Sequence, residues 1–505
     1  MVLLGAIDQG TSSSRFLVFE SDSGELVAYH QIAVEEKTPQ PGWVEMCPEQ
    51  LYTTTMDCIE EVCRSFPSAK NIKAIGIANQ RETTVAWDKS TGKALYNAIL
   101  WLDSRTSDLA SEYIKKTPTK NKDYFKAKTG LPIHPYFSAL KLNWLLNNIE
   151  GVKRAKENGN LLFGTVDSWL LWHMTGGAVH VCDVSNASRT LLMDLGKRRW
   201  STELCDFFDI PIEILPEIKS SAEIYGILNA GSLKGMPISG CLCDQQAAMV
   251  GHCCFRRGEC KATYGTGTFF LCNTGKEPIF SQNGMLTTIV YQFGKEGGIC
   301  YALEGSGSIG GNVIHFLRDN LKFIKECKEI DELAGSVDHT DGVYFVPSFT
   351  GLFSPYWDST ARGIICGLTL GTTQGHIALA ALKSIAFEIA EMVEFVQKDL
   401  KNTDIRLGTL KIDGGLTVSQ IFDQVQADVL GSSIVNSTMT EVSGWGAAIA
   451  AGIGAGQFTL EEFSQRQPPK RREFCPKSTE KERMEQYKKW KEAVQRAKNW
   501  SVSEH

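Results

Sequence analysis

The chain has 505 residues, of which 43% are hydrophobic and 22% charged, and its formal net charge is −6. This length allows two to four domains with large cores, and the acidic balance argues against a nucleic-acid-binding surface. No apolar segment approaches the roughly 18 residues that a membrane span needs, and no cleavable leader opens the chain, so we expect a cytoplasmic protein. The fifteen cysteines lack C-x-x-C spacing, which predicts neither a disulfide framework nor a zinc site.

The first predicted element is a hairpin over residues 3–20, in which two apolar runs flank a polar tip. An ordinary solvated turn explains the glycine and the serines, but it does not explain Asp8 before them or Arg15 after them. Backbone N–H groups beside Gly10, together with the tip hydroxyls, could bind an anion, with Asp8 available for a hydrated Mg²⁺ and Arg15 for phosphate charge. The hydroxyls belong to Thr11, Ser12 and Ser13. From this stretch alone, both interpretations stay open.

Strand-like runs then alternate with helix-like stretches, which is typical of an α/β architecture. The strand-like runs cover residues 72–79, 97–103 and 161–167, and one such helix covers residues 138–149. Arg81 and Glu82 follow the first of these runs. Adjacent opposite charges at the end of a strand usually form a surface turn, so on their own they predict no chemistry.

Near the midpoint, residues 235–251 and 260–275 repeat the sequence pattern of residues 3–20. An apolar strand ends in an aspartate, and an apolar pair then flanks a Gly/Thr tip. This weak internal symmetry predicts two similar domains whose polar tips face a shared cleft. Asp244 and Gln245 directly follow a buried-looking strand, where α/β sheets place their sites; a buried structural aspartate is the alternative.

The glycines at 305, 307 and 310 match G-x-G-x-x-G, but a charged helix-like stretch follows them instead of the second strand and acid that a dinucleotide site needs. The Walker and protein-kinase motifs are absent. Residues 407–430 indicate a strand, an Asp-Gly-Gly turn and a helix, and such a helix start suits a phosphate or nucleotide. Residues 478–500 predict a docked terminal helix with a capping box at Thr479 and Glu482.

The pieces in this order, from "DQGTSSSR" and "NQRETTVAWD" through "FGTVDSWLLW", "DQQAAMVG" and "YGTGTFF" to "IDGG", resemble the family of sugar and polyol kinases built on the actin-like ATPase fold. Within that family they are most similar to the branch that phosphorylates glycerol. The resemblance covers nearly the whole chain. Residues 136–148 fit the first family signature, and residues 363–383 fit the second except at Lys383, where an acidic residue or glutamine is usual.

The resemblance implies an α/β fold of two actin-like (ribonuclease H-like) ATPase domains that flank a catalytic cleft. Residues 1–247 would carry the glycerol site and the first phosphate hairpin, and residues 248–505 the nucleotide site and the terminal helix. The implied activity is Mg²⁺- and ATP-dependent phosphorylation of glycerol to sn-glycerol 3-phosphate, by a homodimer or other homo-oligomer. A kinase of another small polyol or sugar and a non-catalytic nucleotide switch are the alternatives. Association with the mitochondrial outer surface stays open.

The resemblance also assigns roles to individual residues. The glycerol set is Arg81, Glu82, Tyr136, Asp244 and Gln245, with Trp101 and Phe269 as apolar walls and Asp244 as the base. The nucleotide set is Thr11, Ser12, Ser13, Arg15, Gly265, Thr266, Gly311, His315, Gly415 and Ser419, and Asp8 is the Mg²⁺ partner. The positions that depart from the family's usual residues are His315, Ser419, Cys243, Ala262 and Trp445. None of them removes a catalytic group, although they bear on nucleotide affinity and turnover.

Overall fold

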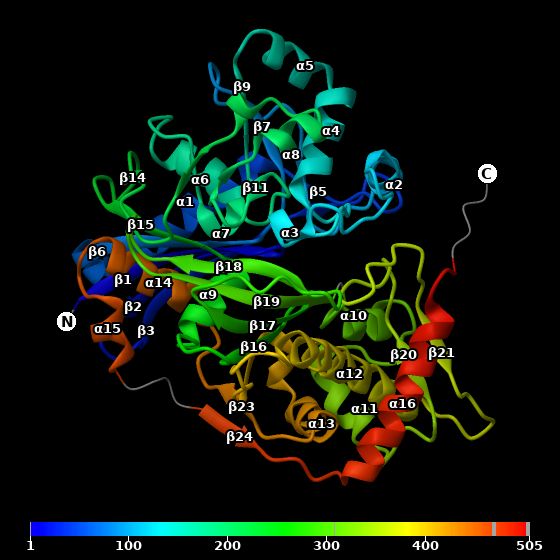
Figure 1. The fold of residues 1–505 in the computed structure, drawn as a ribbon. Helices are drawn as coiled ribbons and strands as arrows, with labels where there is room; N and C mark the ends of the chain where they lie inside the picture. The colour runs from blue at the N-terminus through cyan, green and yellow to red at the C-terminus, as the bar shows by residue number, and fades with distance from the viewer. Residues whose placement is uncertain (1, 308, 467–470, 501–505) are drawn as a thin grey trace.

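The computed structural model describes residues 2–307, 309–466 and 471–500, and two β-sheets form its frame (Figure 1). In the first sheet the strand order is β14-β15-β6-β1-β2-β3. The strands are β1 (Leu3–Gln9), β2 (Ser13–Glu20), β3 (Leu26–Ala33), β6 (Ile72–Asn79), β14 (Gly226–Ile227) and β15 (Pro237–Cys243). β1, β2 and β3 are antiparallel neighbours, whereas β6 runs parallel to β1 and to β15.

The second sheet repeats this plan in the order β18-β19-β17-β16-β22-β23-β24. Its strands are β16 (Cys260–Tyr264), β17 (Thr268–Gly275), β18 (Leu286–Gln292), β19 (Ile299–Gly307), β22 (Leu410–Asp413), β23 (Ile434–Ser437) and β24 (Arg471–Phe474). β16 pairs antiparallel with β17 and parallel with β22, as β1 does with β2 and β6. The internal symmetry predicted from the two Gly/Thr hairpins is therefore present.

The first hairpin forms because its apolar residues can be buried on both faces of a central strand. In β1 all seven residues are buried. Leu4 and Ala6 contact one hydrophobic core, whereas Leu3 and Ile7 contact another on the opposite face, as the two-residue period of a strand requires. A strand that is covered on both sides has a continuous apolar sequence. Burial of this apolar segment fixes the position of the polar residues that follow it.

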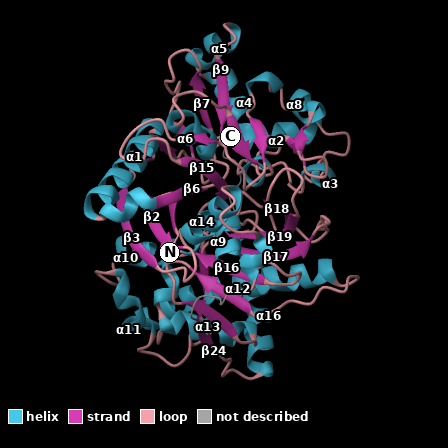
Figure 2. Ribbon diagram, turned by 90° about the vertical axis from the view of Figure 1, so that its left-hand side faces the viewer, coloured by secondary structure: helices cyan, strands magenta, loops and turns pink. Residues whose placement is uncertain are grey.

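Helices from distant parts of the chain cover the first sheet. α1 (Pro48–Ser65) packs on β2 and β3, while α14 (Val442–Gly454) packs on β1, β6 and β15 and against α9 (Asp244–Gly251). Both Figures 1 and 2 show α9 and α14 between the two sheets. Small residues allow this close approach, because a Cβ at Gly446 would overlap the carbonyl oxygen of Ala247. Trp445, also on α14, packs between Phe19 and Phe463.

The second sheet is covered by α12 (Gln374–Leu400), with α13, α10, α11 and α16 around it. Their bounds are α10 (Asn312–Asp319), α11 (Ile330–Ala334), α13 (Gln420–Leu430) and α16 (Glu480–Ala497). α16 has the predicted capping box and buries Trp490, Val494 and Ala497. Met484 lies at the helical spacing of this docked face, yet it is 66% exposed. Lys383 donates to Gln486 over 3.2 Å and so links α12 to α16.

Shorter elements complete the fold. Those of the first half are β4 (Glu36–Lys37), β5 (Glu45–Met46), β7 (Val85–Asp88), β8 (Ala98–Ile99), α2 (Ser107–Lys116), α3 (Lys126–Thr129), α4 (Ser138–Asn148), α5 (Glu150–Glu157), β9 (Leu161–Gly164), α6 (Val166–Met174), β10 (Val181–Asp183), α7 (Val184–Ala187), β11 (Met193–Asp194), β12 (Arg199–Trp200), α8 (Thr202–Phe207) and β13 (Glu217–Lys219). Those of the second half are β20 (Tyr344–Val346), β21 (Ile364–Cys366) and α15 (Leu460–Ser464). The helix predicted at 138–149 is present as α4, whereas the run at 97–103 contributes only the two-residue strand β8.

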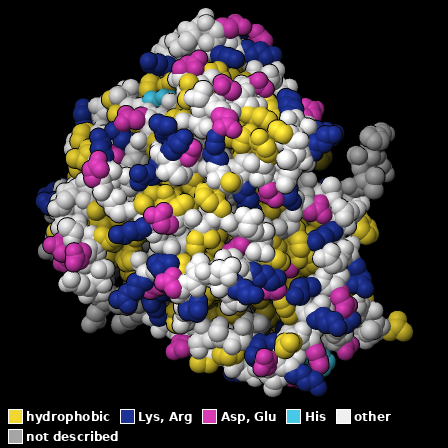
Figure 3. All heavy atoms as spheres, viewed as in Figure 1, with side chains coloured by type: hydrophobic (Ala, Val, Ile, Leu, Met, Phe, Trp, Pro, Cys, Tyr) yellow, Lys and Arg dark blue, Asp and Glu magenta, His cyan; other side chains and the backbone are white. Residues whose placement is uncertain are grey.

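Within the three described ranges, no helix is both long and apolar enough to cross a membrane. All fifteen cysteines are free thiols. On the face shown in Figure 3, acidic and basic side chains are interspersed with apolar ones.

Candidate active site

The site lies where three neighbouring strands of the first sheet end. β1, β6 and β15 are parallel, and their registers align Gln9 and Cys243 with Asn79. Asp8 stands near the end of β1, Arg81 and Glu82 follow β6, and Asp244 follows β15. The carboxyl edge of parallel strands is where α/β sheets bind ligands, so the fold brings together charged residues that are far apart in the sequence.

The tip of the first hairpin is a closed turn, in which the N–H of Gly10 donates to the carbonyl of Ser13 over 3.0 Å. Ser13 is buried and Ser12 is exposed, whereas the hydroxyl of Thr11 accepts a hydrogen bond from the indole of Trp101 over 3.0 Å. Beside the tip, Arg15 pairs with Asp8 at 3.4 Å and with Glu441 at 3.2 Å. Ser12 is thus the exposed hydroxyl of the tip, whereas the hydroxyl of Thr11 lies against Trp101.

The second hairpin tip is joined to the glycine-rich segment after β19. The N–H of Gly311 donates to the carbonyl of Gly265 over 2.7 Å, and that of Gly310 to the carbonyl of Thr266 over 2.8 Å. A Cβ at Gly310 would overlap the backbone of Gly267. Gly310 therefore allows close packing of two backbone segments, a role that requires no dinucleotide.

A chain of alternating buried charges runs through the predicted glycerol set. Asp244 pairs with Arg81 at 3.2 Å, and Arg81 pairs with Glu304 on β19. Glu304 also accepts from Arg189 over 2.9 Å, and Arg189 pairs with Glu82 at 2.7 Å. Burial disfavours a charged carboxylate, but Arg189 and Arg81 together lower the pKa of Glu304. The chain crosses from the first sheet to the second and back.

Aromatic rings enclose one side of these charges. The guanidinium of Arg81 lies 4.8 Å from the ring centre of Phe269 and donates to the hydroxyl of Tyr136 over 3.3 Å. Trp101 packs against Tyr136 and Phe269, with ring centres 5.9 and 5.7 Å apart. Apolar walls beside fixed donors and acceptors suit a small ligand that has both carbon and hydroxyl surface.

The backbone at Glu82 is in the left-handed region, with φ of 58°. Such a conformation in a residue other than glycine stores strain of about 1 to 3 kcal/mol. It is held by hydrogen bonds from the hydroxyls of Ser138 and Thr84 to the carbonyl of Glu82. A strained backbone that is supported in this way is characteristic of functional sites.

Asp244 begins α9, and 26% of its side chain is exposed. Gln245 donates to it twice, from the backbone N–H to Oδ1 over 2.7 Å and from the side-chain amide to Oδ2 over 3.2 Å. The N–H of the preceding residue, Cys243, donates to the hydroxyl of Ser185 over 3.0 Å. Asp244 is therefore oriented by its neighbours yet accessible to a ligand.

The remaining predicted nucleotide positions, Gly415, His315 and Ser419, lie on elements around the second sheet. Gly415 is exposed at the start of a short 3₁₀ turn, and His315 is exposed on α10. Ser419 is buried, and its hydroxyl caps α13 by accepting from the N–H of Phe422 over 3.0 Å while it donates to Asp331. The hydroxyl of Ser419 is thus engaged within the protein.

The structure adds three buried residues that the sequence analysis did not single out as site residues: Arg189, Glu304 and Lys261. Glu304 is the only acidic residue in the otherwise apolar and small sequence of β19. An isolated charge in a strand that is buried along its length needs a partner, and this signal could have identified Glu304. Its partner could not have been chosen by the same reasoning.

The donor set near Asp8 fits Mg²⁺. Burial raises the pKa of Asp8 to about 6, and the nearby carboxylates of Glu441 and Asp244 add to this rise while Arg15 opposes it. Carboxylate oxygens crowded together are suitable ligands for a divalent cation. In the described part of the chain no three His, Cys, Asp or Glu side chains could hold a metal by themselves, so Mg²⁺ here would also need phosphate oxygens and water.

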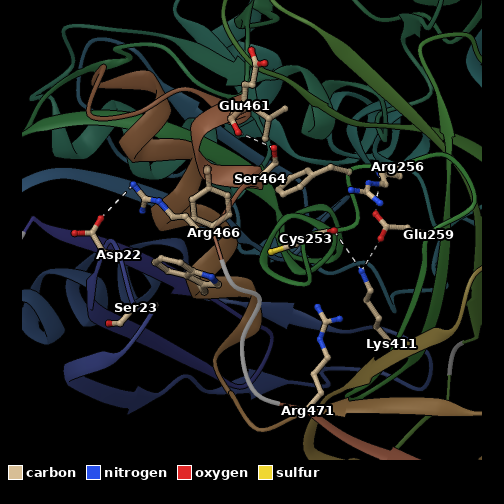
Figure 4. Close-up of a pocket in the computed structure, with 15 residues that line it drawn as sticks. Asp22, Ser23, Cys253, Arg256, Glu259, Lys411, Glu461, Ser464, Arg466 and Arg471 are labelled. Atoms are coloured by element: carbon tan, nitrogen blue, oxygen red, sulfur yellow. Dashed lines mark hydrogen bonds and ion pairs between the residues drawn. The ribbon is translucent and has the colours of Figure 1, made fainter.

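A separate cavity of about 600 Å³ lies beside α15 (Figure 4). Two of its cations are already paired, Arg466 with Asp22 at 3.3 Å and Lys411 with Glu259 at 3.3 Å. The described residues that line this cavity include none of the predicted site residues.

The two repeated sheets and the charged edge between them define an actin-like phosphotransferase. Comparison with known proteins is more specific: the chain belongs to the FGGY family of carbohydrate kinases, whose N-terminal domain model matches residues 3–251 and whose C-terminal domain model matches residues 260–455.

Several relatives match the chain over almost its full length. A probable glycerol kinase of Caenorhabditis elegans is 59% identical over 99% of this chain and 100% of that protein, and one of Dictyostelium discoideum is 43% identical over 98% of each. The crystal structure of Plasmodium falciparum glycerol kinase with ADP superposes with a TM-score of 0.86, at 36% identity and 98% coverage of both chains.

Proposed function

We propose that this protein is a glycerol kinase, which transfers the γ-phosphoryl group of Mg²⁺-bound ATP to glycerol and forms sn-glycerol 3-phosphate and ADP. The observation that carries the proposal is the buried charge chain Asp244–Arg81–Glu304–Arg189–Glu82 beside the rings of Trp101 and Phe269. The close similarity to glycerol kinases supports the choice of substrate.

In this mechanism Asp244 accepts the proton of the attacking hydroxyl, since it is the oriented and accessible carboxylate of the set. Arg81 donates to a second hydroxyl and Glu82 accepts from it, while Tyr136 and the aromatic walls position the carbon chain. Arg15 and the backbone of both hairpin tips bind the phosphates. Asp8 would hold Mg²⁺, which supplies charge neutralisation for the phosphoryl group when it is bound.

The nucleotide residues of this proposal are Thr11, Ser12, Ser13, Gly265, Thr266, Gly311, His315, Gly415 and Ser419. Because the hydroxyl of Ser419 already donates its proton to Asp331, a nucleotide could contact this position only by donating to the remaining lone pair of the hydroxyl oxygen or through the backbone. The proposal also includes a homo-oligomer, which sedimentation of the purified protein tests, and a cytoplasmic location, which cell fractionation tests; the same fractionation decides the open question of association with the mitochondrial surface.

A coupled assay with ATP and a panel of acceptors tests the proposed activity. Glycerol should be the preferred acceptor over dihydroxyacetone, erythritol and xylulose. Propane-1,3-diol, which lacks the middle hydroxyl, should lose on the order of 100-fold or more in kcat/KM, because buried polar groups would be left unpaired. Equal use of glycerol and propane-1,3-diol would contradict the assignment of Arg81 and Glu82, and ATP hydrolysis without any acceptor would favour a nucleotide switch.

A further inference from the structure

A lysine of the second sheet reaches Gln245, the residue that follows the proposed base Asp244. Lys261 lies on β16, its side chain is fully buried, and its ammonium group donates to Oε1 of Gln245 and to the hydroxyl of Thr263, the latter over 2.8 Å. A buried ammonium is unfavourable unless it is paired and hydrogen-bonded. Packing of the strand does not explain why a lysine is buried at this position, beside Gln245 and close to Asp244.

The contact fixes the orientation of an amide. A protonated lysine donates hydrogen bonds and accepts none, so the side chain of Gln245 must turn its oxygen toward Lys261. Its NH₂ group must then face the other way, and there it donates to Oδ2 of Asp244 over 3.2 Å. If the amide were reversed, its oxygen would face the carboxylate, and the two acceptors would repel each other.

We propose that Lys261 is a positioning residue for phosphoryl transfer: it locks the amide of Gln245 so that Gln245 donates to Asp244 and holds that carboxylate ready to accept the proton of the attacking hydroxyl. This inference rests on the proposed function and adds a residue to it. Because Lys261 belongs to the second sheet and Gln245 to a helix that follows the first, the base is aligned only while the two domains are in contact.

The surroundings of Lys261 support a charged role. The charged groups that act on it are Asp413, Asp244, Arg81 and Glu304, and Asp413 is itself bound to His252 over 2.5 Å. Burial lowers the pKa of Lys261 to about 8, although Asp413 and Asp244 oppose this shift. Above that pH the amine loses a proton and can accept a hydrogen bond, so it no longer enforces one orientation of the amide.

The first test compares Lys261→Met with the wild type in the full-length enzyme. We expect kcat to fall on the order of 10- to 100-fold, less than loss of the base itself, with a smaller change in the KM for glycerol. The acidic limb of the pH profile of kcat should move to higher pH, and Lys261→Arg should restore part of the rate. The matched control is Lys411→Met, a buried lysine on the neighbouring strand whose ammonium binds Glu259 and the carbonyl of His252; it should leave kcat unchanged.

A second variant covers the case in which Lys261→Met does not fold. Gln245→Glu keeps the shape of the side chain and strengthens its pairing with Lys261, so it should fold, yet it removes the donor and places a second carboxylate against Asp244. Its kcat should fall and its acidic limb should shift upward. In addition, Lys261→Met should change kcat less than about 2-fold in a Gln245→Leu background, since Lys261 acts through Gln245.

Wild-type kinetics in Lys261→Met or in Gln245→Glu would overturn the inference, and so would effects of Lys261→Met and Gln245→Leu that multiply independently. Failure of the proposed function gives a different result, because the wild type itself would then not phosphorylate glycerol.

Discussion

Among single residues, Asp244 has the most direct role in the proposed mechanism, and its substitution is the simplest test of that mechanism. Asp244→Asn keeps the shape and one acceptor oxygen but cannot accept a proton, so kcat should fall by roughly 10²- to 10⁴-fold while the protein stays folded. The affinity for glycerol should change less, because Arg81, Glu82 and Tyr136 are intact. Steady-state kinetics with circular dichroism measures both effects.

The matched control for this variant is Asp57→Asn, an exposed aspartate on α1 at the opposite face of the sheet. It should retain the wild-type rate. If Asp244→Asn kept more than about a tenth of the wild-type kcat, Asp244 would only position the substrate and another group would be the base.

Glu304 should be important because it binds two arginines of the other domain. Glu304→Gln removes the charge that draws Arg81 and Arg189 together and leaves buried cations under-compensated, so the free energy of unfolding should fall by about 3 to 5 kcal/mol. The kcat/KM for glycerol should fall as well, because Arg81 can then pair more closely with Asp244. Urea unfolding and initial rates measure the two effects, with Glu259→Gln, a partly exposed ion pair, as the comparison. A fully stable and active Glu304→Gln would show that the charge chain is dispensable.

The raised pKa of Asp8 gives a pH dependence with a definite sign. A carboxyl with a pKa of about 6 becomes protonated as the pH falls through 6, and protons then compete with Mg²⁺. The apparent affinity for Mg²⁺ should therefore decrease below pH 6. The activity lost at that pH should return when the Mg²⁺ concentration is raised. Titration of activity with Mg²⁺ at pH 5.5 and 7.5 measures this, and Asp8→Asn should show a weak apparent affinity for Mg²⁺ at both pH values. Equal Mg²⁺ affinity at the two pH values in the wild type would contradict the role of Asp8.

At the scale of elements, α14 should tolerate almost no increase in side-chain size where it meets α9. Gly446→Ala would place a methyl group on the carbonyl oxygen of Ala247, and overpacking of this kind destabilises a protein by about 1 to 3 kcal/mol. Gly151→Ala is the control, since it is also a helical glycine but its Cβ would have only ordinary contacts. It should stabilise the protein by up to about 1 kcal/mol through helix propensity. Thermal unfolding measures both, and an equal response of the two variants would be inconsistent with the close packing.

The elements that sequence alone predicts are those whose evidence is local. The two Gly/Thr hairpins, α4 and the capped α16 follow from periodicity and capping within a few residues. The run at 97–103 looked like a strand because it is apolar. Only Ala98 and Ile99 form a strand, and the chain then turns at Trp101 and Leu102. Met484 fits the helical spacing of α16, but the apolar side chains of the helix pack against its neighbours only from Tyr487 onward.

For the site, the strand-end position of Asp244 could be predicted from sequence, because the carboxyl edge of parallel strands is a general ligand site, whereas Arg81 and Glu82 were assigned only through the family resemblance. The partners of these residues could not be predicted. The pairing of Arg81 with Glu304 joins residues 223 positions apart, and no periodicity connects them. Lys261 was hidden for a related reason, since a lysine in a predicted strand is normally expected to reach solvent.

For the whole molecule, the proposed phosphate-binding role of both hairpin tips predicts a motion. Binding of ATP and glycerol together should move the two domains closer to each other around the proposed site and exclude water. Small-angle scattering should then show a smaller radius of gyration with both ligands than with either alone. The Asp244→Asn variant allows the measurement without turnover. An unchanged radius, together with rapid ATP hydrolysis in the absence of glycerol, would favour a nucleotide switch over a kinase.

The return of α14 to the first sheet affects how the protein is made on the ribosome. The strands of that sheet are complete once β15 has been synthesised, but α14 follows roughly 200 residues later. At typical synthesis rates this interval lasts roughly 10 to 40 s, during which one apolar face of the nascent sheet lacks its covering helix. The emerging first half should therefore be a substrate for chaperones until translation has almost finished.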